Sequence, residues 1–383
     1  MKHAHTLLAA TLAGLSATAL ADVTLYGAID ETLESVSARG AANSSKNIGQ
    51  TTRINSNSSL IGFKGSEDLG NGLKAIWQVE SGIAIDTGGG NFATRDSFVG
   101  LTSPSAGTLQ LGLLTSSARA MGGIFDINKA STGIGMSAAL LGKLGNFAIT
   151  DPALKTQATG TIGLFDSRLR NSVQYVTPSF AGFSASALYG SGENGSGPRA
   201  YNANIGVKYE DSALYAGLSY TRSTTGADDS SATSVSAFRK LSDLRAAAIY
   251  RFSANTRIGL IYDRTEGDLT QAASLVYGTR ELKQSVWYVN GALGVGNHGR
   301  VIAQYGQSGK LSGGNSSLAD SGKAQHYALG YEYDLSKRTL LKAMYSEIRN
   351  NSAANYDFGI GAVGNVAAGA DPKGFAVGLR HTF

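Results

Sequence analysis

The chain has 383 residues, of which 33 are lysine or arginine and 28 are aspartate or glutamate, and its formal net charge is +5. This excess is small and scattered, so the composition does not favour nucleic-acid binding, and no nucleic-acid partner is expected. Cysteine is absent, which excludes a disulfide framework and any thiolate metal site. The mean hydropathy is close to neutral, at −0.08.

The first 21 residues have the pattern of a secretory signal peptide. Lys2 precedes an apolar stretch at 7–20, and Ala19 and Ala21 form a small-residue cleavage site. Cleavage would leave 383 − 21 = 362 residues. Beyond this segment, no run approaches the roughly 20 apolar residues that a membrane-spanning helix needs. An exported chain of this kind is either soluble or crosses a membrane as β-strands.

The last eleven residues favour the second possibility. Phe375, Val377 and Leu379 alternate with small or polar residues up to the terminal aromatic Phe383. This period of two places apolar side chains on one face of a strand and polar or small ones on the other. An exported chain that ends on such a strand is typical of an outer-membrane β-barrel.

Further strand-like segments of about 9–11 residues recur along the chain, as a transmembrane barrel requires. The expected segments are 23–34, 59–66, 73–85, 95–103, 108–115, 168–177, 181–190, 201–209, 213–222, 244–252, 256–264, 280–295, 300–307, 325–333, 339–348 and 373–383. The sequence therefore predicts an all-β fold, an antiparallel transmembrane barrel of about 16 strands that forms one domain over residues 22–383.

Short turns and long loops alternate between these segments, so the two ends of the barrel should differ. The short turns are expected on the periplasmic side. The long external loops are expected at 35–58, 86–94, 223–243, 265–279, 308–324 and 350–372. The longest connection, 116–167, is unusually apolar, with residues such as Phe125, Ile134, Leu140 and Leu144. A loop of this composition is unlike one that stays in water, and we expect it to fold into the barrel lumen.

Several stretches make the chain similar to the trimeric Gram-negative porins of the β-proteobacterial and neisserial type. They are 22–27 (Asp-Val-Thr-Leu-Tyr-Gly), 62–75 with its Glu-Asp-Leu-Gly-Asn-Gly turn, 95–101, 171–183 and 378–383. The resemblance implies a 16-stranded barrel, a homotrimer, and a water-filled pore narrowed by the loop after the fifth strand. It also implies passive diffusion of small hydrophilic solutes and ions, with a weak preference for anions. The partners expected with it are outer-membrane lipid, lipopolysaccharide and, through Phe383, the barrel-assembly machinery.

The resemblance also indicates candidate residues for the pore constriction. Arg95 and Arg168 match family positions for wall arginines, whereas Leu60 and Leu113 stand where two further arginines are expected. Arg170 is a third candidate, and Arg53 could replace a missing arginine. Opposing carboxylates are expected from the long loop, namely Asp126, Asp151 and Asp166. For each arginine, a role in bonding a loop or reaching the membrane interface is the alternative.

The sequence does not favour two other classes of function, a barrel enzyme and a soluble β-protein or adhesin. A barrel enzyme would need a nucleophile with a base in reach, but His298, His326 and His381 are not framed by any recognisable motif or metal-ligand spacing. We therefore expect no catalytic residues, no metal and no cofactor. A soluble β-protein or adhesin would need polar outer faces, whereas an apolar face recurs on almost every segment.

Overall fold

The computed structural model describes residues 22–129, 132–145, 163–193, 199–226, 237–313 and 320–383, and the backbone of 158–159. The expected signal peptide at 1–21 lies outside the described residues. Among those described, no helix is both long enough and apolar enough to cross a membrane.

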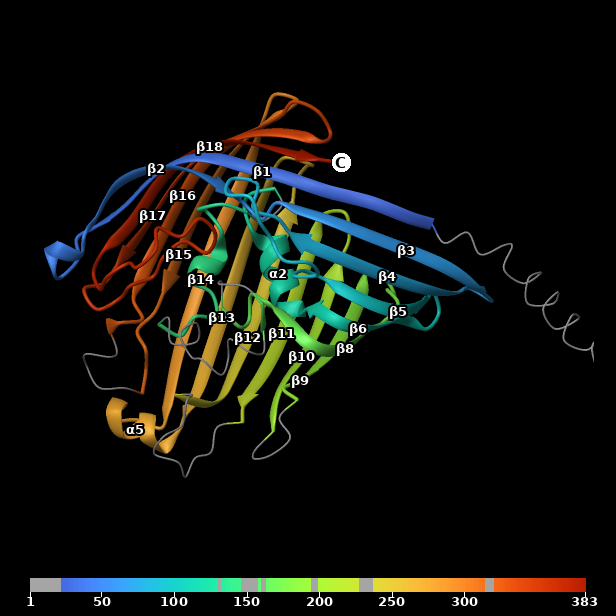
Figure 1. The fold of residues 1–383 in the computed structure, drawn as a ribbon, viewed down its shortest axis with the longest axis horizontal. Helices are drawn as coiled ribbons and strands as arrows, with labels where there is room; N and C mark the ends of the chain where they lie inside the picture. Colours follow the sequence, from blue (N-terminus) through green and yellow to red (C-terminus); the bar gives the residue numbers. More distant parts are fainter. Residues whose placement is uncertain are drawn as a thin grey trace, which may run out of the picture.

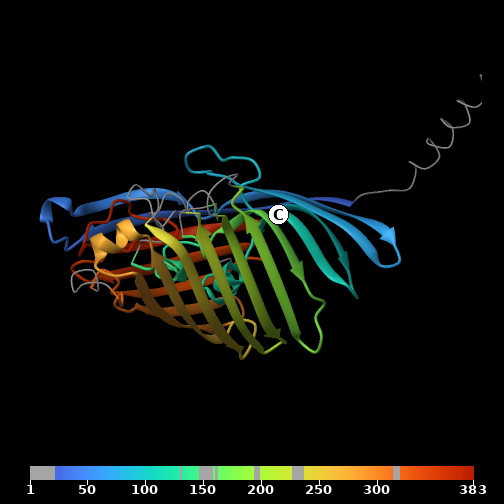
Figure 2. The same cartoon turned by 90° about the horizontal axis from the view of Figure 1, so that it is seen from below.

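The strands belong to one antiparallel sheet that closes on itself (Figures 1 and 2). They are β1 (Asp22–Arg39), β2 (Ile48–Ser56), β3 (Leu60–Gly70), β4 (Leu73–Gly82), β5 (Ser97–Ser103), β6 (Gly107–Thr115), β7 (Ala158–Thr159), β8 (Arg168–Val176), β9 (Phe183–Ser191), β10 (Ala200–Glu210), β11 (Leu214–Thr225), β12 (Phe238–Arg251), β13 (Arg257–Leu269), β14 (Glu281–Val295), β15 (Gly299–Ser308), β16 (Ala324–Asp334), β17 (Thr339–Asn350) and β18 (Asp371–Thr382). β18 pairs with β1 from Ala28↔Thr382 to Arg39↔Asp371, which closes the ring.

In the described part of the chain, the barrel wall has 16 strand positions, as the sequence predicts. β2 and β3 pair with successive halves of the same side of β1. They are separated only by a short break in which Ser58 has a φ of 61°, so together they occupy one strand position in the barrel wall. β7 has two residues and pairs only with the start of β8. Two of the 18 strands therefore add no separate position in the barrel wall, and 18 − 2 = 16 strand positions remain.

Three of the expected external loops are shorter than predicted, and one of them is 223–243, since β11 continues to Thr225 and β12 begins at Phe238. The segment 35–58 was expected to be a loop, but β1 continues to Arg39 and β2 begins at Ile48. The prediction was wrong because this part of the hairpin has polar residues on both faces, so it lacks the alternation of a lipid-facing strand. β13 likewise runs to Leu269, and the short helix α5 (Gln271–Tyr277) follows it.

The apolar faces point away from the barrel interior. On β18, Phe375 and Leu379 are exposed on the outside, whereas Ala376 between them is buried. Leu109 and Leu111 on β6 and Leu260 on β13 repeat this arrangement. An apolar outer band of this kind is the surface that contacts lipid in a transmembrane barrel.

The described part of the long loop lies inside the barrel, as its apolar composition predicts. It begins with helix α2 (Ser117–Phe125), which Figure 1 shows within the ring of strands, and it includes the 3₁₀ turn η2 (Ser137–Ala139). Phe125 and Leu140 are fully buried in a cluster with the inward-facing Ile261 and Tyr288 of the wall. Phe147 and Ile149 of this loop lie outside the described residues. The loop therefore fills one side of the lumen with an apolar core.

Candidate pore constriction

A polar cavity remains between the loop and the opposite part of the wall. Its volume is about 230 Å³. It is lined by residues before β3 and β5, by α2 and η2, by the start of β8 and by β18. The charged side chains on its lining are Arg95, Arg119, Arg168, Arg380, Asp126 and Asp166. Four of the seven predicted site residues thus lie around one cavity.

Arg95 and Arg168 are held on the wall by carboxylates. Arg95 precedes β5, and its Nε donates to Oε1 of Glu80 on β4. Arg168 begins β8, and its Nε donates to Oδ2 of Asp96 over 2.6 Å. Its Nη2 also lies 3.8 Å from Oε1 of Glu80. These contacts fix the two guanidinium groups beside each other at the lining of the cavity.

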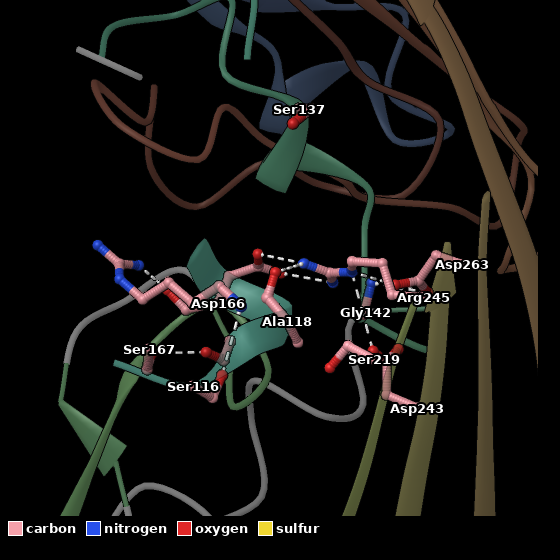
Figure 3. A network of polar contacts seen from close by, with 12 residues as sticks. Ser116, Ala118, Ser137, Gly142, Asp166, Ser167, Ser219, Asp243, Arg245 and Asp263 are labelled. Carbon is pink, nitrogen blue, oxygen red and sulfur yellow. Dashed lines mark hydrogen bonds and ion pairs between the residues drawn. The ribbon is translucent and has the colours of Figure 1, made fainter. Parts of the chain in front are cut away.

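The carboxylate of Asp166 binds a buried arginine (Figure 3). Nη1 and Nη2 of Arg245 on β12 donate to the two oxygens of Asp166 over 2.7 and 3.0 Å. Nε of Arg245 donates to Asp263 on β13 over 2.8 Å, and Nη1 also donates to the carbonyl of Ala118 over 3.1 Å. The Asp166 carboxylate therefore attaches the loop to the barrel wall.

Asp126 has a comparable structural role at the end of α2. Its Oδ1 accepts a hydrogen bond from the backbone N–H of Ser137 over 2.8 Å and another from the Ser137 hydroxyl. The side chain is almost fully buried, at 3% exposure. The guanidinium of Arg257 on β13 donates to the carbonyls of Ile124, Phe125 and Asp126 at the C-terminal end of the helix, where carbonyls are otherwise unpaired.

The other three predicted residues are not on the cavity lining. Arg53 donates from Nε to Glu34 over 3.0 Å and also to the carbonyls of Gly361 and Ala362, in the connection between β17 and β18. This matches the alternative role of bonding a loop. Arg170 on β8 is exposed and is not part of the lining. Asp151 lies outside the described residues.

Sequence reasoning overlooked Arg119 as a lining residue. It lies in the first turn of α2, where the hydroxyl of the N-cap residue Ser116 accepts from its backbone N–H over 3.3 Å. It is the sole basic residue in the stretch 116–128, and this isolation among small and apolar residues was the available signal. Arg380 on β18 is the other addition. Its Nη1 donates to Asp30 over 3.3 Å.

A closed barrel with an apolar outer surface, an inward-folded loop and a charged cavity defines a membrane channel. A family profile described as Gram-negative porin matches residues 4–353. The chain therefore belongs to the Gram-negative porin family.

Individual relatives agree with this assignment. The chain is 32% identical over 344 residues to the major outer membrane protein P.IB of Neisseria meningitidis serogroup A, a match that covers 87% of this chain and 89% of that protein. It is 30% identical over 386 residues to the protein of that description from Neisseria lactamica, covering 98% and 99%. A match to the gonococcal protein, 37% identical over 221 residues, covers 55% of this chain and 56% of that protein.

Solved structures are similar over nearly the whole chain. An anion-selective porin from Comamonas acidovorans is 25% identical, with a TM-score of 0.75 and coverage of 95% of this chain and 100% of that chain. A trimer form of in-vitro folded OmpT from Vibrio cholerae is 15% identical, with a TM-score of 0.61 and coverage of 95% and 99%, which shows the fold alone. The chain is an outer-membrane porin for passive diffusion and not an enzyme, as predicted from the sequence.

Proposed function

We propose that solutes and ions pass through the polar cavity beside α2 and that this passage favours anions. The observation that carries the proposal is the difference between the charges at the lining. The loop carboxylates Asp126 and Asp166 are buried and bonded to groups that hold the loop, whereas the guanidinium groups of Arg95 and Arg168 keep some contact with the cavity. The lining carries four guanidinium groups and only these two carboxylates, so an ion in the cavity meets more positive than negative charge.

The physical reason for a preference is the hydration of the ion. An ion in a narrow pore loses part of its hydration shell, and fixed charges on the wall must offset this cost. Arginine suits the task because its guanidinium remains protonated and its planar fork can bind an anion transiently. The guanidinium groups on the lining would together lower this cost for anions and raise it for cations. The anion selectivity described for the porin from Comamonas acidovorans supports this reading.

The proposal includes the processing and assembly of the chain. We infer cleavage after Ala21, a barrel over residues 22–383 with 116–167 as the constriction loop, and a homotrimer like the trimer form of OmpT. Lipopolysaccharide would contact the outer band. Phe383 would be recognised by the barrel-assembly machinery, and its backbone N–H and C=O both bond Gly27 of β1 over 3.1 Å at the closing seam.

Reversal potentials in planar bilayers test the selectivity. With a tenfold KCl gradient across the membrane, we expect a potential whose sign corresponds to faster chloride than potassium. A potential of the opposite sign would contradict the proposal. Heat-modifiable migration in detergent gels, measured on the same preparation, verifies that the barrel under test is folded.

A further inference from the structure

Arg119 differs from the wall arginines in its bonding partners. In the described part of the chain, no carboxylate oxygen lies within 4.0 Å of its guanidinium. Its Nη1 donates instead to the backbone carbonyl of Asp166. The residue lines the same cavity as Arg95 and Arg168. Arg119 therefore brings a positive charge to the lining of the cavity without an ion pair to a carboxylate.

The wall arginines, by contrast, are largely neutralised. Arg95 is paired with Glu80, and Arg168 is paired with Asp96 at 2.6 Å and lies 3.8 Å from Glu80. Two positive charges thus face two negative charges. An ion a few ångströms away experiences such a group mainly as a set of dipoles, whose field falls off faster than that of a single charge.

The position of Arg119 is electrostatically unfavourable in three ways. It lies in the first turn of α2, where the helix dipole disfavours a positive charge, and no acidic residue in that turn compensates for it. Burial lowers the pKa of Arg119 to about 10, and the guanidinium groups of Arg168 and Arg95 act in the same direction, whereas the carboxylates of Asp166 and Asp96 oppose them in part. The side chain nevertheless remains protonated at neutral pH. A residue placed against several local preferences at once is a candidate for a functional role.

The guanidinium is also held in place. The carbonyl of Asp166 accepts from Arg119, and the carboxylate of the same residue is bound by both terminal nitrogens of Arg245. Arg245 in turn donates to Asp263 over 2.8 Å (Figure 3). This chain of bonds connects Arg119 to the rigid sheet, so its charge keeps a defined position relative to a passing ion.

We infer that Arg119, carried by the constriction loop, is the main residue that determines the preference of this pore for anions. The inference rests on the proposed function of the cavity and adds to it the residue that sets its selectivity. The field comes from the loop and the wall together, and on the loop side it comes from a guanidinium that forms no ion pair within 4.0 Å among the described residues. Small anions, inorganic or carboxylate, are the solutes that such a charge favours.

The experiment compares chloride-to-potassium permeability ratios of Arg119 variants, from reversal potentials in a KCl gradient. One unit charge about 4 Å away in a water-like dielectric changes the population of an ion about fivefold. We therefore expect Arg119→Gln to lower the ratio about fivefold or more. Arg119→Lys, which retains the charge without the planar fork, should stay within about twofold of the parent. A purely structural role for Arg119 would not produce this dependence on charge.

Two comparison variants sharpen the result. The double variant Glu80→Gln with Arg95→Gln removes a neutral pair and should lower the ratio by less than half as much as Arg119→Gln, on a logarithmic scale. Arg349→Gln, at an exposed pair on β17, should leave it unchanged. The inference is overturned if the parent pore prefers anions and Arg119→Gln retains the parent ratio within twofold. A parent pore that prefers cations would instead refute the proposed function itself.

Discussion

The bonds of Arg245 predict that the loop is released when this side chain is removed. Arg245 is fully buried and is surrounded by Asp166, Asp243 and Asp263. Arg245→Met would leave the carboxylates buried without their cation, and breaking a buried pair in this way costs about 3–5 kcal/mol. The hydrogen bonds of the sheet remain, so we expect the cost to appear as release of the loop from the wall. At 1.4 kcal/mol for each tenfold change, the released fraction should rise about 100- to 4,000-fold.

Because the sequence has no cysteine, labelling of a single introduced thiol can measure release of the loop. Ala139→Cys places one thiol in the loop at a position that is fully buried in the apolar cluster. A water-soluble maleimide reaches this thiol only while the loop is released, so the labelling rate follows the released fraction. We expect the rate in the Arg245→Met background to exceed the parent rate by at least about a hundredfold.

A matched control is available on the neighbouring strand. Arg264 pairs with Glu266 at 3.2 Å, but both side chains are more than one-third exposed, so the pair contributes about 0–1 kcal/mol. Arg264→Met should therefore change the labelling rate less than about fivefold. Equal labelling rates in the Arg245→Met and parent barrels, both folded by gel migration, would refute the idea that Arg245 holds the loop.

Three other perturbations test separate parts of the structure. Arg53→Gln removes the bonds to Glu34 and to two carbonyls between β17 and β18, and hydrogen bonds to a charged group contribute about 1.5–3 kcal/mol each. Single-channel conductance should therefore rise as that loop loosens, whereas the control Arg349→Gln should not change it. Equal conductance of Arg53→Gln and the parent would contradict the role of Arg53 in holding this loop. Burial lowers the pKa of Lys143 in the loop from 10.5 to about 8, so its ammonium destabilises the folded state below pH 8 and this cost disappears as the pH rises to 10.5. The parent protein should therefore gain up to about 3 kcal/mol of stability between these pH values, and Lys143→Met should lack this gain. Thermal unfolding in detergent measures both, and equal pH profiles of the parent and the variant would contradict the effect of Lys143. Leu260→Arg on the outer face of β13 should reduce folding into lipid vesicles, at a cost of about 2–4 kcal/mol near the bilayer centre, whereas Leu335→Arg in a short turn should fold normally; equal yields would refute the assignment of the lipid face.

The strands of the barrel could be predicted because a local rule constrains each of them. A lipid-facing strand must show apolar residues at every second position, and Leu109 and Leu111 or Phe375 and Val377 do so without reference to any other part of the chain. The extension of β1 and β2 above this band escaped the rule because outward-facing positions there, such as Ser35 and Gln50, are polar. Helix α2 escaped because Gly122 and Gly123 give it weak intrinsic propensity.

The site was less predictable because its roles depend on distant partners. Arg95 and Arg168 could be proposed from their resemblance to family positions, and the structure places both at the cavity. Whether Asp166 faces the pore or the wall depends on Arg245, which lies 79 residues away in the sequence. No local pattern reports such a pairing. Arg119 was overlooked for the same reason, since its exposure to the cavity depends on the path of the whole loop.

The large apolar residues of the lumen wall lie mainly on β12–β15, and this distribution explains where the cavity lies. The inward faces of β12–β15 carry Ile249, Ile261, Tyr288 and Ile302, which are buried against the loop. Close packing of this kind leaves no room for water or ions. The wall around Arg95 carries charged groups that pair with wall carboxylates and not, as Arg245 does, with a carboxylate of the loop, and burying them under apolar residues would be costly. The loop therefore lies against β12–β15, and the polar cavity is left on the side where the guanidinium groups of Arg95 and Arg168 are.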